Sequence, residues 1–594
     1  MRKVQQTVDV AGKAAAGNHS RTAAWIMALP PLVLAALAFA LPYAASLGLG
    51  LAGTGRDYLS LVKRVLPILA FTLKQAVLST LLALALGLPG AWFLSSPEGG
   101  RRGGPSPFRR FLRSLSALPF ALPPILVVLG FALFFGNSGW VNRALGALSG
   151  TTAGPLRILY RPEAIILAHG FYNFPLVLRL AGDSLEQARR AYLPAAASLG
   201  ASPLKALFPI LLPLCLPGIV SAALLVFLYC FTSFAVVLVL GGGPGTSTLA
   251  VEIYRYARIS LDYGAAGILA LVETAVAAVV FLLYLVLVGR LDRINTTADR
   301  NRLMTGKETF ASRLALGLYG LLMIFLVLGP ILSIPLESLL QRASRAGLRE
   351  FSLYWWRISG EGALPALGRS LILACSSAAL SCLLAVLANG AILASEAVLA
   401  SEAVLANDVV LGSGRSNGAG PARGTGNRGG GPLKTIVRIA AVSPLASSGI
   451  VLGLGWLILY GREHSRSFLS VSLVHSVIAL PFAFNSISQG LANLPPNVMR
   501  AGTVFGAGPL VRIVTLALPI ASTRLRSAWA FAAAISLGEL NAVMMLGMEG
   551  WETLPLFIYR AAGAYRYGAA CAGGTLLIAC CAVLFVLSDL GRGT

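Results

Sequence analysis

The sequence predicts an all-α membrane protein with about twelve transmembrane helices in two homologous six-helix halves. Three observations predict this fold class. Of the 594 residues, 56% are apolar and only 12% are charged. Apolar runs of about 20 residues, each long enough to cross a hydrocarbon layer roughly 30 Å thick, recur from end to end. Matching segments of the two halves also lie a nearly constant distance apart, which is the mark of an internal duplication.

Each half carries six apolar runs that we expect to span the membrane. In the first half they cover 24–49, 68–94, 115–135, 164–180, 212–240 and 265–288. In the second half they cover 314–336, 371–394, 436–460, 469–487, 516–546 and 569–587. Because each half has an even number of spans, both halves enter the membrane in the same sense, related by a pseudo-twofold axis along the membrane normal. Both termini then lie on one side.

Basic residues predict which side that is. They are concentrated before the first span, in the loop after the second span and in the linker between the halves, as Arg21, Arg101 and Arg302 exemplify. The positive-inside rule therefore places both termini in the cytoplasm. Arg342 and Arg349, in a loop expected to be external, run against this rule.

The net charge of +24 does not indicate a nucleic-acid partner, because the basic residues are divided among short loops and form no compact basic domain. Membrane lipid is the expected counterpart. The seven cysteines are scattered through apolar helices, and the four histidines form no cluster with them. We therefore expect no metal and no cofactor.

The duplication is visible in pairs of identical residues that lie 306 positions apart. These pairs are His169 with His475, Pro175 with Pro481, Gly200 with Gly506, and Pro213 with Pro519. The pairing predicts a first half over 1–290 with its core at about 70–290, a cytoplasmic linker over 291–312, and a second half over 313–594 with its core at about 365–590. A tandem repeat and a Gly-rich tract predict a flexible cytoplasmic insertion with a helical extension at about 395–432.

One connector in each half, between the fourth and fifth spans, has the same composition. Small residues precede a glycine turn, a proline opens a short helix, and a second proline opens the next span. The candidate residues are Ala195, Ala196, Gly200, Pro203 and Pro213 in the first half, and Ala501, Gly506, Pro509 and Pro519 in the second. A single copy would be an ordinary helix–turn–helix connector. Two copies at matched depth favour a docking site, because small side chains let another surface approach the backbone.

These connectors resemble the EAA loop of type I ABC-importer permeases, whose pattern is Glu-Ala-Ala, three residues, Gly, and a stretch that ends in Pro. In that family the loop docks on the ATPase subunit. This sequence departs at the Glu position, which is Pro194 in one half and Arg500 in the other. The resemblance thus implies that these loops couple the chain to an ATPase subunit, but without the acidic residue that makes a contact in the family.

The resemblance also implies partners and a location. It implies a bacterial inner-membrane permease that works with an ATP-binding subunit, expected in two copies, and with an external solute-binding protein. Fused two-half permeases of this kind resemble thiamine and iron(III) importers. The segments 167–175, 230–244 and 536–541 look most like those of thiamine-importer permeases. Thiamine or its phosphates is the expected substrate, and iron(III) is the alternative.

The chain is not expected to be an enzyme. No segment fits the phosphate-binding pattern Gly-x4-Gly-Lys-Ser/Thr, since Gly306-Lys307 is followed by Glu308. ATP hydrolysis is expected on a separate chain. The rival is an ion-coupled secondary transporter, which would need embedded carboxylates such as Glu273.

Three further residues are expected to line the translocation path. They are Ser233, Glu539 and Asn541, each toward the end of a predicted span. The alternative interpretation of a polar residue there is a side chain whose hydrogen bonds are satisfied within the helix bundle.

Overall fold

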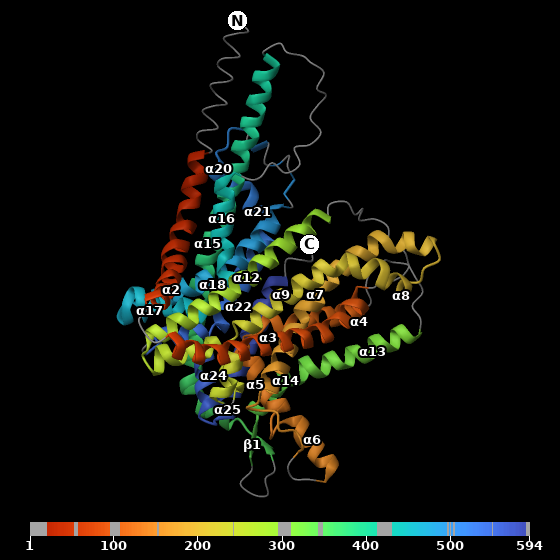
Figure 1. Ribbon diagram of the computed structural model, residues 1–594, viewed down its shortest axis with the longest axis vertical. Coiled ribbons are helices and arrows are strands. Elements are labelled where there is room, and N and C mark those ends of the chain that lie inside the picture. The colour runs from red at the N-terminus through yellow and green to blue at the C-terminus, as the bar shows by residue number, and fades with distance from the viewer. Residues whose placement is uncertain are drawn as a thin grey trace.

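The computed structural model describes residues 21–52, 58–95, 107–150, 154–241, 243–294, 310–342, 349–412, 431–492, 494–495, 498, 501–502, 505–548 and 550–589. Helices dominate this part, and its strands are the antiparallel pair β1 (Leu340–Arg342) and β2 (Arg349–Phe351). Figure 1 shows two helix bundles that diverge from the end of the molecule that carries β1 and α6 (Trp140–Ser149). The short helices α8 and α20 lie toward the ends of different bundles.

The first half comprises η1 (Ala35–Ala40), α2 (Leu41–Ala52), α3 (Tyr58–Leu94), α4 (Pro107–Ala121), α5 (Pro124–Phe135), α6, α7 (Pro162–Ser198), α8 (Pro203–Ala206), η3 (Leu207–Leu211), α9 (Leu212–Phe231), α10 (Ala235–Leu240), η4 (Pro244–Thr246), α11 (Leu249–Tyr254), η5 (Arg255–Ile259) and α12 (Tyr263–Ile294). The second half comprises α13 (Phe310–Met323), η7 (Ile324–Leu328), α14 (Gly329–Ser338), α15 (Tyr354–Gly412), α16 (Pro432–Val442), η8 (Ser443–Ala446), α17 (Gly449–Ser465), α18 (Phe468–Ala492), α20 (Pro509–Arg512), η9 (Ile513–Ala517), α21 (Leu518–Ile520), α22 (Ser522–Gly538), α23 (Asn541–Leu546), α24 (Leu554–Gly563) and α25 (Tyr567–Asp589).

Ten helices of the described residues are long and apolar enough to cross a membrane, and a bent pair raises the number to eleven. The bent pair joins Pro432–Leu445 to Gly449–Ser465 at 105°. The apolar run predicted at 516–546 is not one continuous helix. There the chain divides into η9, α21, α22 and α23, since Pro519 interrupts the helix at one end and Glu539 lies in a break at the other.

Equivalent contacts repeat in the two halves. The Thr72 hydroxyl on α3 accepts a hydrogen bond from the backbone N–H of Leu249 at 3.1 Å, where α11 begins. The Ser370 hydroxyl on α15 does the same for Leu554 at 2.8 Å, where α24 begins. A hydroxyl in this position satisfies a backbone donor that has no partner inside its own helix. The duplication found in the sequence therefore extends to individual hydrogen bonds.

The first helix of each half packs onto the core of the other half. Helix α2 lies against α17, and α14 lies against α5. A Cβ added to Gly455 of α17 would lie 1.7 Å from the carbonyl oxygen of Pro42, and one added to Gly130 of α5 would lie 2.5 Å from that of Pro330. Both crossings thus bring backbone onto a glycine, as small residues allow between membrane helices. The predicted cores, which start near 70 and 365, leave out these two exchanged helices.

A π-helical segment precedes the proline at both crossings. In the first half it is η1, which ends before Pro42, and in the second half it is η7, which ends before Pro330. Because proline has no N–H, the carbonyl of Ala38 loses its usual α-helical donor. Trp456 Nε1 of α17 donates to that carbonyl instead, at 2.9 Å. Pro42 therefore leaves the Ala38 carbonyl free to accept this hydrogen bond, which attaches the first helix of the first half to α17 of the second.

The insertion expected at 395–432 is partly helical. Helix α15 continues through the tandem repeat as far as Gly412, which is where a helical extension of the insertion was expected. An ion pair of 2.6 Å between Lys434 Nζ and Glu396 Oε1 joins α16 to α15. Residues 413–430 lie outside the described part.

Candidate functional site

The first predicted docking loop forms the end of α7 and the beginning of α9. Ala195 and Ala196 lie in the last turns of α7, together with Pro194. Gly200 follows with φ +80°, a left-handed conformation that suits glycine. The N–H of Ala201 donates to the carbonyl of Ala196 at 3.0 Å, which closes the helix in the manner of a Schellman motif. Pro203 then begins α8, and Pro213 lies in the first turn of α9.

The second predicted loop has the same backbone geometry. Gly506 has φ +74°, and the N–H of Ala507 donates to the carbonyl of Gly502 at 3.0 Å. Ala501 lies one residue before Gly502, in a helical turn. Pro509 begins α20, and Pro519 lies in α21. Arg500, the residue at the Glu position of the motif, lies outside the described part.

The tip of each loop carries an exposed apolar side chain that the sequence analysis missed. Leu199 is 88% exposed and Phe505 is 87% exposed. Each residue directly precedes the left-handed glycine, and a Cβ built on either glycine would meet nothing within 4 Å. The signal in the sequence was a large apolar residue before the glycine in both copies. Exposed apolar side chains beside open backbone are typical of surfaces that bind another protein.

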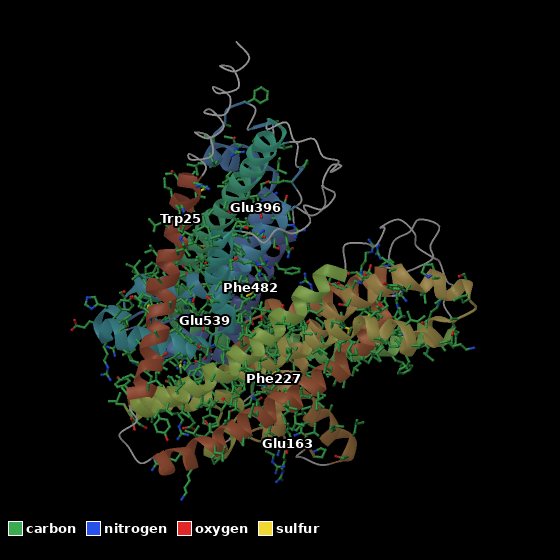
Figure 2. All side chains as sticks on the ribbon, turned by 45° about the horizontal axis from the view of Figure 1, so that its top comes forward. Trp25, Glu163, Phe227, Glu396, Phe482 and Glu539 are labelled. Atoms are coloured by element: carbon green, nitrogen blue, oxygen red, sulfur yellow. The ribbon has the colours of Figure 1, made fainter. Side chains whose placement is uncertain are left out.

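A cavity of about 280 Å³ lies between the two halves. Figure 2 shows two of its lining residues, Glu539 and Phe482, near the meeting of the two bundles. Six pairs of residues 306 positions apart line it together: Tyr172 with Ile478, Tyr229 with Ile535, Thr232 with Gly538, Ser233 with Glu539, Phe234 with Leu540, and Ala235 with Asn541. A cavity lined by both members of so many pairs lies on the pseudo-twofold axis. All three residues expected along the path, Ser233, Glu539 and Asn541, are among them.

The paired helices break where they line the cavity. Helix α9 ends at Phe231 and α10 begins at Ala235, while α22 ends at Gly538 and α23 begins at Asn541. Glu539 lies in the second break. Its Oε1 accepts hydrogen bonds from the N–H groups of Asn541 at 2.9 Å and Ala542 at 3.2 Å. The carboxylate therefore compensates backbone donors that the break leaves without helical partners.

A chain of hydrogen bonds fixes the hydroxyl of Ser233, which occupies the position equivalent to Glu539. Gln75 Nε2 donates to the carbonyl of Cys230 at 2.8 Å, so Gln75 Oε1 is left to accept from His169 Nδ1 at 3.1 Å. The neutral imidazole of His169 then accepts, at Nε2, a hydrogen bond of 2.8 Å from the Ser233 hydroxyl. In the second half His475 bonds Ser536 instead, at 2.8 Å. The two histidines are helix-packing hydrogen bonders, and only His169 borders the cavity.

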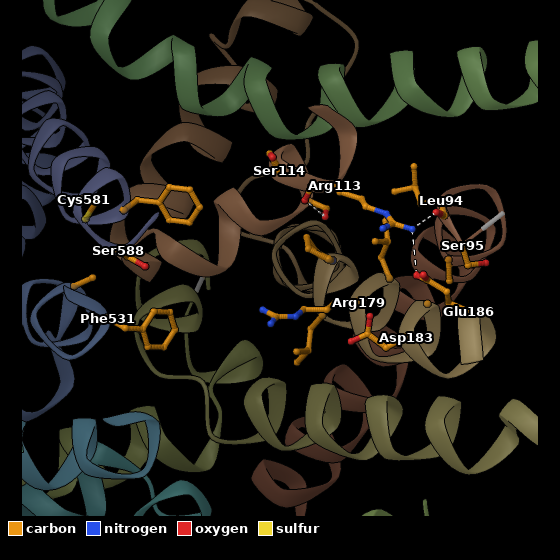
Figure 3. A pocket seen from close by; sticks show the side chains of 18 of the residues that line it. Leu94, Ser95, Arg113, Ser114, Arg179, Asp183, Glu186, Phe531, Cys581 and Ser588 are labelled. Carbon is orange, nitrogen blue, oxygen red and sulfur yellow. Dashed lines mark hydrogen bonds and ion pairs between the residues drawn. The ribbon is translucent and has the colours of Figure 1, made fainter. Parts of the chain in front are cut away.

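A second cavity, of about 410 Å³, adjoins the central one and shares Phe531 and Ala534 with it (Figure 3). Its polar side is formed by α4 and α7. Arg113 forms an ion pair with Glu186 at 3.3 Å, and Arg179 and Asp183 lie on the same wall. This cavity extends toward the α7 end that carries the first docking loop.

A third cavity, of about 190 Å³, shares Ile125 with the central one. Four tyrosines line it: Tyr160, Tyr559, Tyr565 and Tyr567. It lies near the segments that lead into α7 and α25. The first docking loop is at the other end of α7. The three cavities therefore form a series that is joined through the central one by shared lining residues.

Glu273, the other embedded carboxylate considered from the sequence, lies outside this series. It is 1% exposed on α12, and neither carboxylate oxygen has a hydrogen-bond partner among the described residues. Within the same residues no group of three or more His, Cys, Asp and Glu side chains could hold a metal ion.

Comparison with known proteins gives the site a context. Residues 87–293 match the family described as binding-protein-dependent transport system inner membrane component. The chain is 28% identical to the thiamine transport system permease protein ThiP of Brucella abortus over 529 residues, 87% of this chain and 86% of the relative. It is 26% identical to ThiP of Escherichia coli over 88% of each chain.

Two further similarities are partial. A putative 2-aminoethylphosphonate transport system permease protein of Salmonella typhi is 33% identical over 28% of this chain and 56% of its own length. A crystal structure of a bacterial alginate ABC transporter overlaps at a TM-score of 0.37 with 19% identity, over 46% of this chain and 96% of that chain.

The family match covers the core of the first half, and the thiamine permeases align across both halves. These similarities favour an ABC-importer permease over an ion-coupled secondary transporter. The chain is a multi-pass membrane protein of the type I permease fold, whose first half matches the binding-protein-dependent inner-membrane transport family and whose two halves together are similar to thiamine permeases over 87% of the chain.

Proposed function

We propose that this permease imports thiamine and is driven by a separate ATPase that docks on the two loops around Gly200 and Gly506. The observation that carries the coupling proposal is the duplicated loop tip, with the same left-handed glycine and the same exposed apolar residue in each half. The thiamine permeases that align over most of the chain support the choice of substrate. The three adjoining cavities form the translocation path, with Ser233, Glu539 and Asn541 at its centre.

The energetic logic requires a partner. A permease can alternate between two conformations, but a ligand shifts their populations only by binding one of them more tightly than the other. Two equivalent tips at the ends of two diverging bundles suit two copies of an ATPase, whose approach or separation would close or open the bundles. An external solute-binding protein would deliver thiamine on the side opposite the docking loops. Both termini would then be cytoplasmic.

The substrate is tested by uptake of radiolabelled thiamine. Cells without a thiamine importer of their own would express the chain together with the ATPase and the binding protein encoded beside it. We expect uptake that needs all three proteins and that unlabelled thiamine suppresses. Uptake of iron(III) in place of thiamine would contradict the proposal and establish the alternative.

Docking is tested at the two tips, Leu199 and Phe505. Burying a Leu or Phe side chain contributes about 1.5–3 kcal/mol, so aspartate at both positions removes several kcal/mol of contact energy and adds two buried charges. We expect the Leu199→Asp, Phe505→Asp chain to retain less than a tenth of the co-purified ATPase. Leu148→Asp is the matched control, because Leu148 is 85% exposed on α6. Equal retention by the double variant and the control would remove the tips from the interface.

A further inference from the structure

We propose that the tyrosine-lined cavity of about 190 Å³ is an entrance site, where the ring of a flat organic cation binds before the solute reaches the central cavity. The inference rests on the proposed function for the compound to be tested, thiamine, whose thiazolium ring is such a cation. It concerns the ring alone, so thiamine and its phosphates are both ligands of this site.

The lining of this cavity is aromatic and carries no charged side chain among the described residues. Its polar groups are the phenols of four tyrosines, and its other lining residues are apolar: Tyr160, Tyr559, Tyr565 and Tyr567 are the tyrosines. A small, strongly hydrated ion would lose water here and gain no charged partner. A ring that spreads its positive charge over several atoms is instead attracted by the faces of aromatic rings. The lining therefore favours a flat, delocalised cation.

Two of the four tyrosines, one from each half, have a backbone conformation that suits glycine. Tyr160, before α7, has φ +63°, and Tyr565, before α25, has φ +60°. In this left-handed region the Cβ of an L-residue crowds the following carbonyl oxygen, so glycine would form either turn with less strain. Bulky residues are rare there, and strained positions are concentrated at ligand-binding sites. The strain therefore indicates that the two rings serve a ligand.

The duplication shows that such a turn does not itself require a tyrosine. Leu261 has φ +55° and lies two residues before Tyr263, where α12 begins. Tyr565 stands at the same distance from Tyr567, where α25 begins, so the two turns are equivalent in the repeat. Leu261 is not among the residues that line the cavity. Of these two turns, the one that borders the cavity is thus the one that carries an aromatic ring.

The size and shape of the cavity suit one ring. The rings of Tyr565 and Tyr567 form a corner, with centroids 6.3 Å apart and planes at 77°. A flat ring in this corner can stack on one tyrosine and meet the other edge to face, the two arrangements that aromatic pairs prefer. The volume of about 190 Å³ is below the roughly 300–1,000 Å³ common for sites that enclose a whole small molecule. The cavity therefore receives one ring of the solute, and the remainder extends beyond it.

Helix α10 connects this cavity to the central one. Its residues 235–236 line the central cavity, and its residues 238–240 line the tyrosine cavity. Three residues of helix correspond to a distance of about 5 Å. Ile125 of α5 lines both cavities. A ring that leaves the tyrosines therefore reaches the central cavity by moving about one helical turn.

The test measures how well thiamine protects a cysteine placed in this cavity. Gly563→Cys is the reporter, because Gly563 lines the cavity and a Cβ there meets nothing within 4 Å. The full-length chain in nanodiscs of phosphatidylethanolamine and phosphatidylglycerol is labelled with methanethiosulfonate ethylsulfonate, and the unaltered chain gives the background of the native cysteines. We expect thiamine to halve the labelling rate at a concentration at least tenfold lower than its neutral isostere, which has carbon in place of the thiazolium nitrogen. Thiamine monophosphate should protect as well, whereas equal protection by thiamine and the isostere, or protection by iron(III) citrate in place of thiamine, would overturn the proposal.

The role of the two strained tyrosines is tested with Tyr160→Gly and Tyr565→Gly in the reporter chain. We expect each to raise the half-protecting concentration of thiamine at least fivefold, while the melting temperature stays equal or rises because glycine relieves the strain. Leu261→Gly is the matched control: it relieves the same strain at the equivalent turn and should leave protection unchanged. Unchanged protection in both tyrosine variants, or a melting temperature that falls together with protection, would contradict a role in binding. The comparison of thiamine with its isostere remains decisive if a glycine variant fails to fold.

Failure of the inference and failure of the proposed function give different results. Thiamine uptake without protection of the reporter by thiamine contradicts the entrance site but leaves the function intact. If uptake of thiamine is absent, the function fails, and the site is then tested in the same assay with N-benzylpyridinium against neutral 3-benzylpyridine. Protection by the pyridinium ion that depends on Tyr160 and Tyr565 supports the site in that case, and equal protection by the two compounds, or none by either, overturns it.

Discussion

Replacing Gly455 with valine is expected to lower the yield of folded, monodisperse protein at least tenfold. Even a single Cβ at this position would lie 1.7 Å from the carbonyl oxygen of Pro42, and a backbone atom cannot move aside as a flexible side chain can. Helix α2 must then separate from α17, which also stretches the hydrogen bond from Trp456 to Ala38. Overpacking of this kind costs about 1–3 kcal/mol or more, a large part of the stability of most folds. Size-exclusion chromatography of the solubilised chain, with thermal unfolding of what remains, measures the effect.

The duplication supplies an independent repetition of this experiment. Gly130→Val places the same bulk against the carbonyl of Pro330 at the equivalent crossing in the other half, so it should produce a loss of the same kind. Gly48→Val is the control, since Gly48 lies on α2 but a Cβ there meets nothing within 4 Å. If Gly455→Val and Gly48→Val gave the same yield, the close crossing would not be what attaches the exchanged helix.

Much of this architecture could be predicted from sequence because it depends on local pattern. Apolar length predicts the spans, and glycine followed by proline predicts the left-handed turn and the start of the next helix. The offset of 306 residues is enough by itself to connect the two docking loops. The same offset predicts which residues face one another across the pseudo-twofold axis, and Ser233 and Glu539 form such a pair in the central cavity.

Other features depend on contacts that no local pattern encodes. The exchange of α2 and α14 between the halves rests on Gly455 and Gly130, which are 325 positions apart instead of 306, because the first half inserts α6 between α5 and α7. The break of the predicted run at 516–546 is by contrast local, because Glu539 accepts hydrogen bonds from backbone N–H groups two and three residues ahead, but the apolar length of the run conceals it.

Valine at both Gly200 and Gly506 is expected to reduce thiamine uptake to less than a tenth while folded yield stays near normal. Both glycines have positive φ, and a β-branched residue in that region costs at least roughly 1–2 kcal/mol per position. The empty space around both positions rules out a clash as the cause. The chain instead relieves the strain by reorienting the exposed tip, so that Leu199 and Phe505 no longer meet a docking partner together.

Two comparisons separate this cause from general damage. Asparagine tolerates the left-handed conformation, so Gly200→Asn with Gly506→Asn should retain most of the uptake that the valine pair loses. Gly150→Val carries the same backbone penalty at φ +68°, also with nothing within 4 Å, but it lies at the end of α6, away from both loops. Its uptake should be close to that of the unaltered chain. Because only backbone conformation distinguishes valine from asparagine in open space, equal transport by those two double variants would mean that the left-handed turns play no part in coupling.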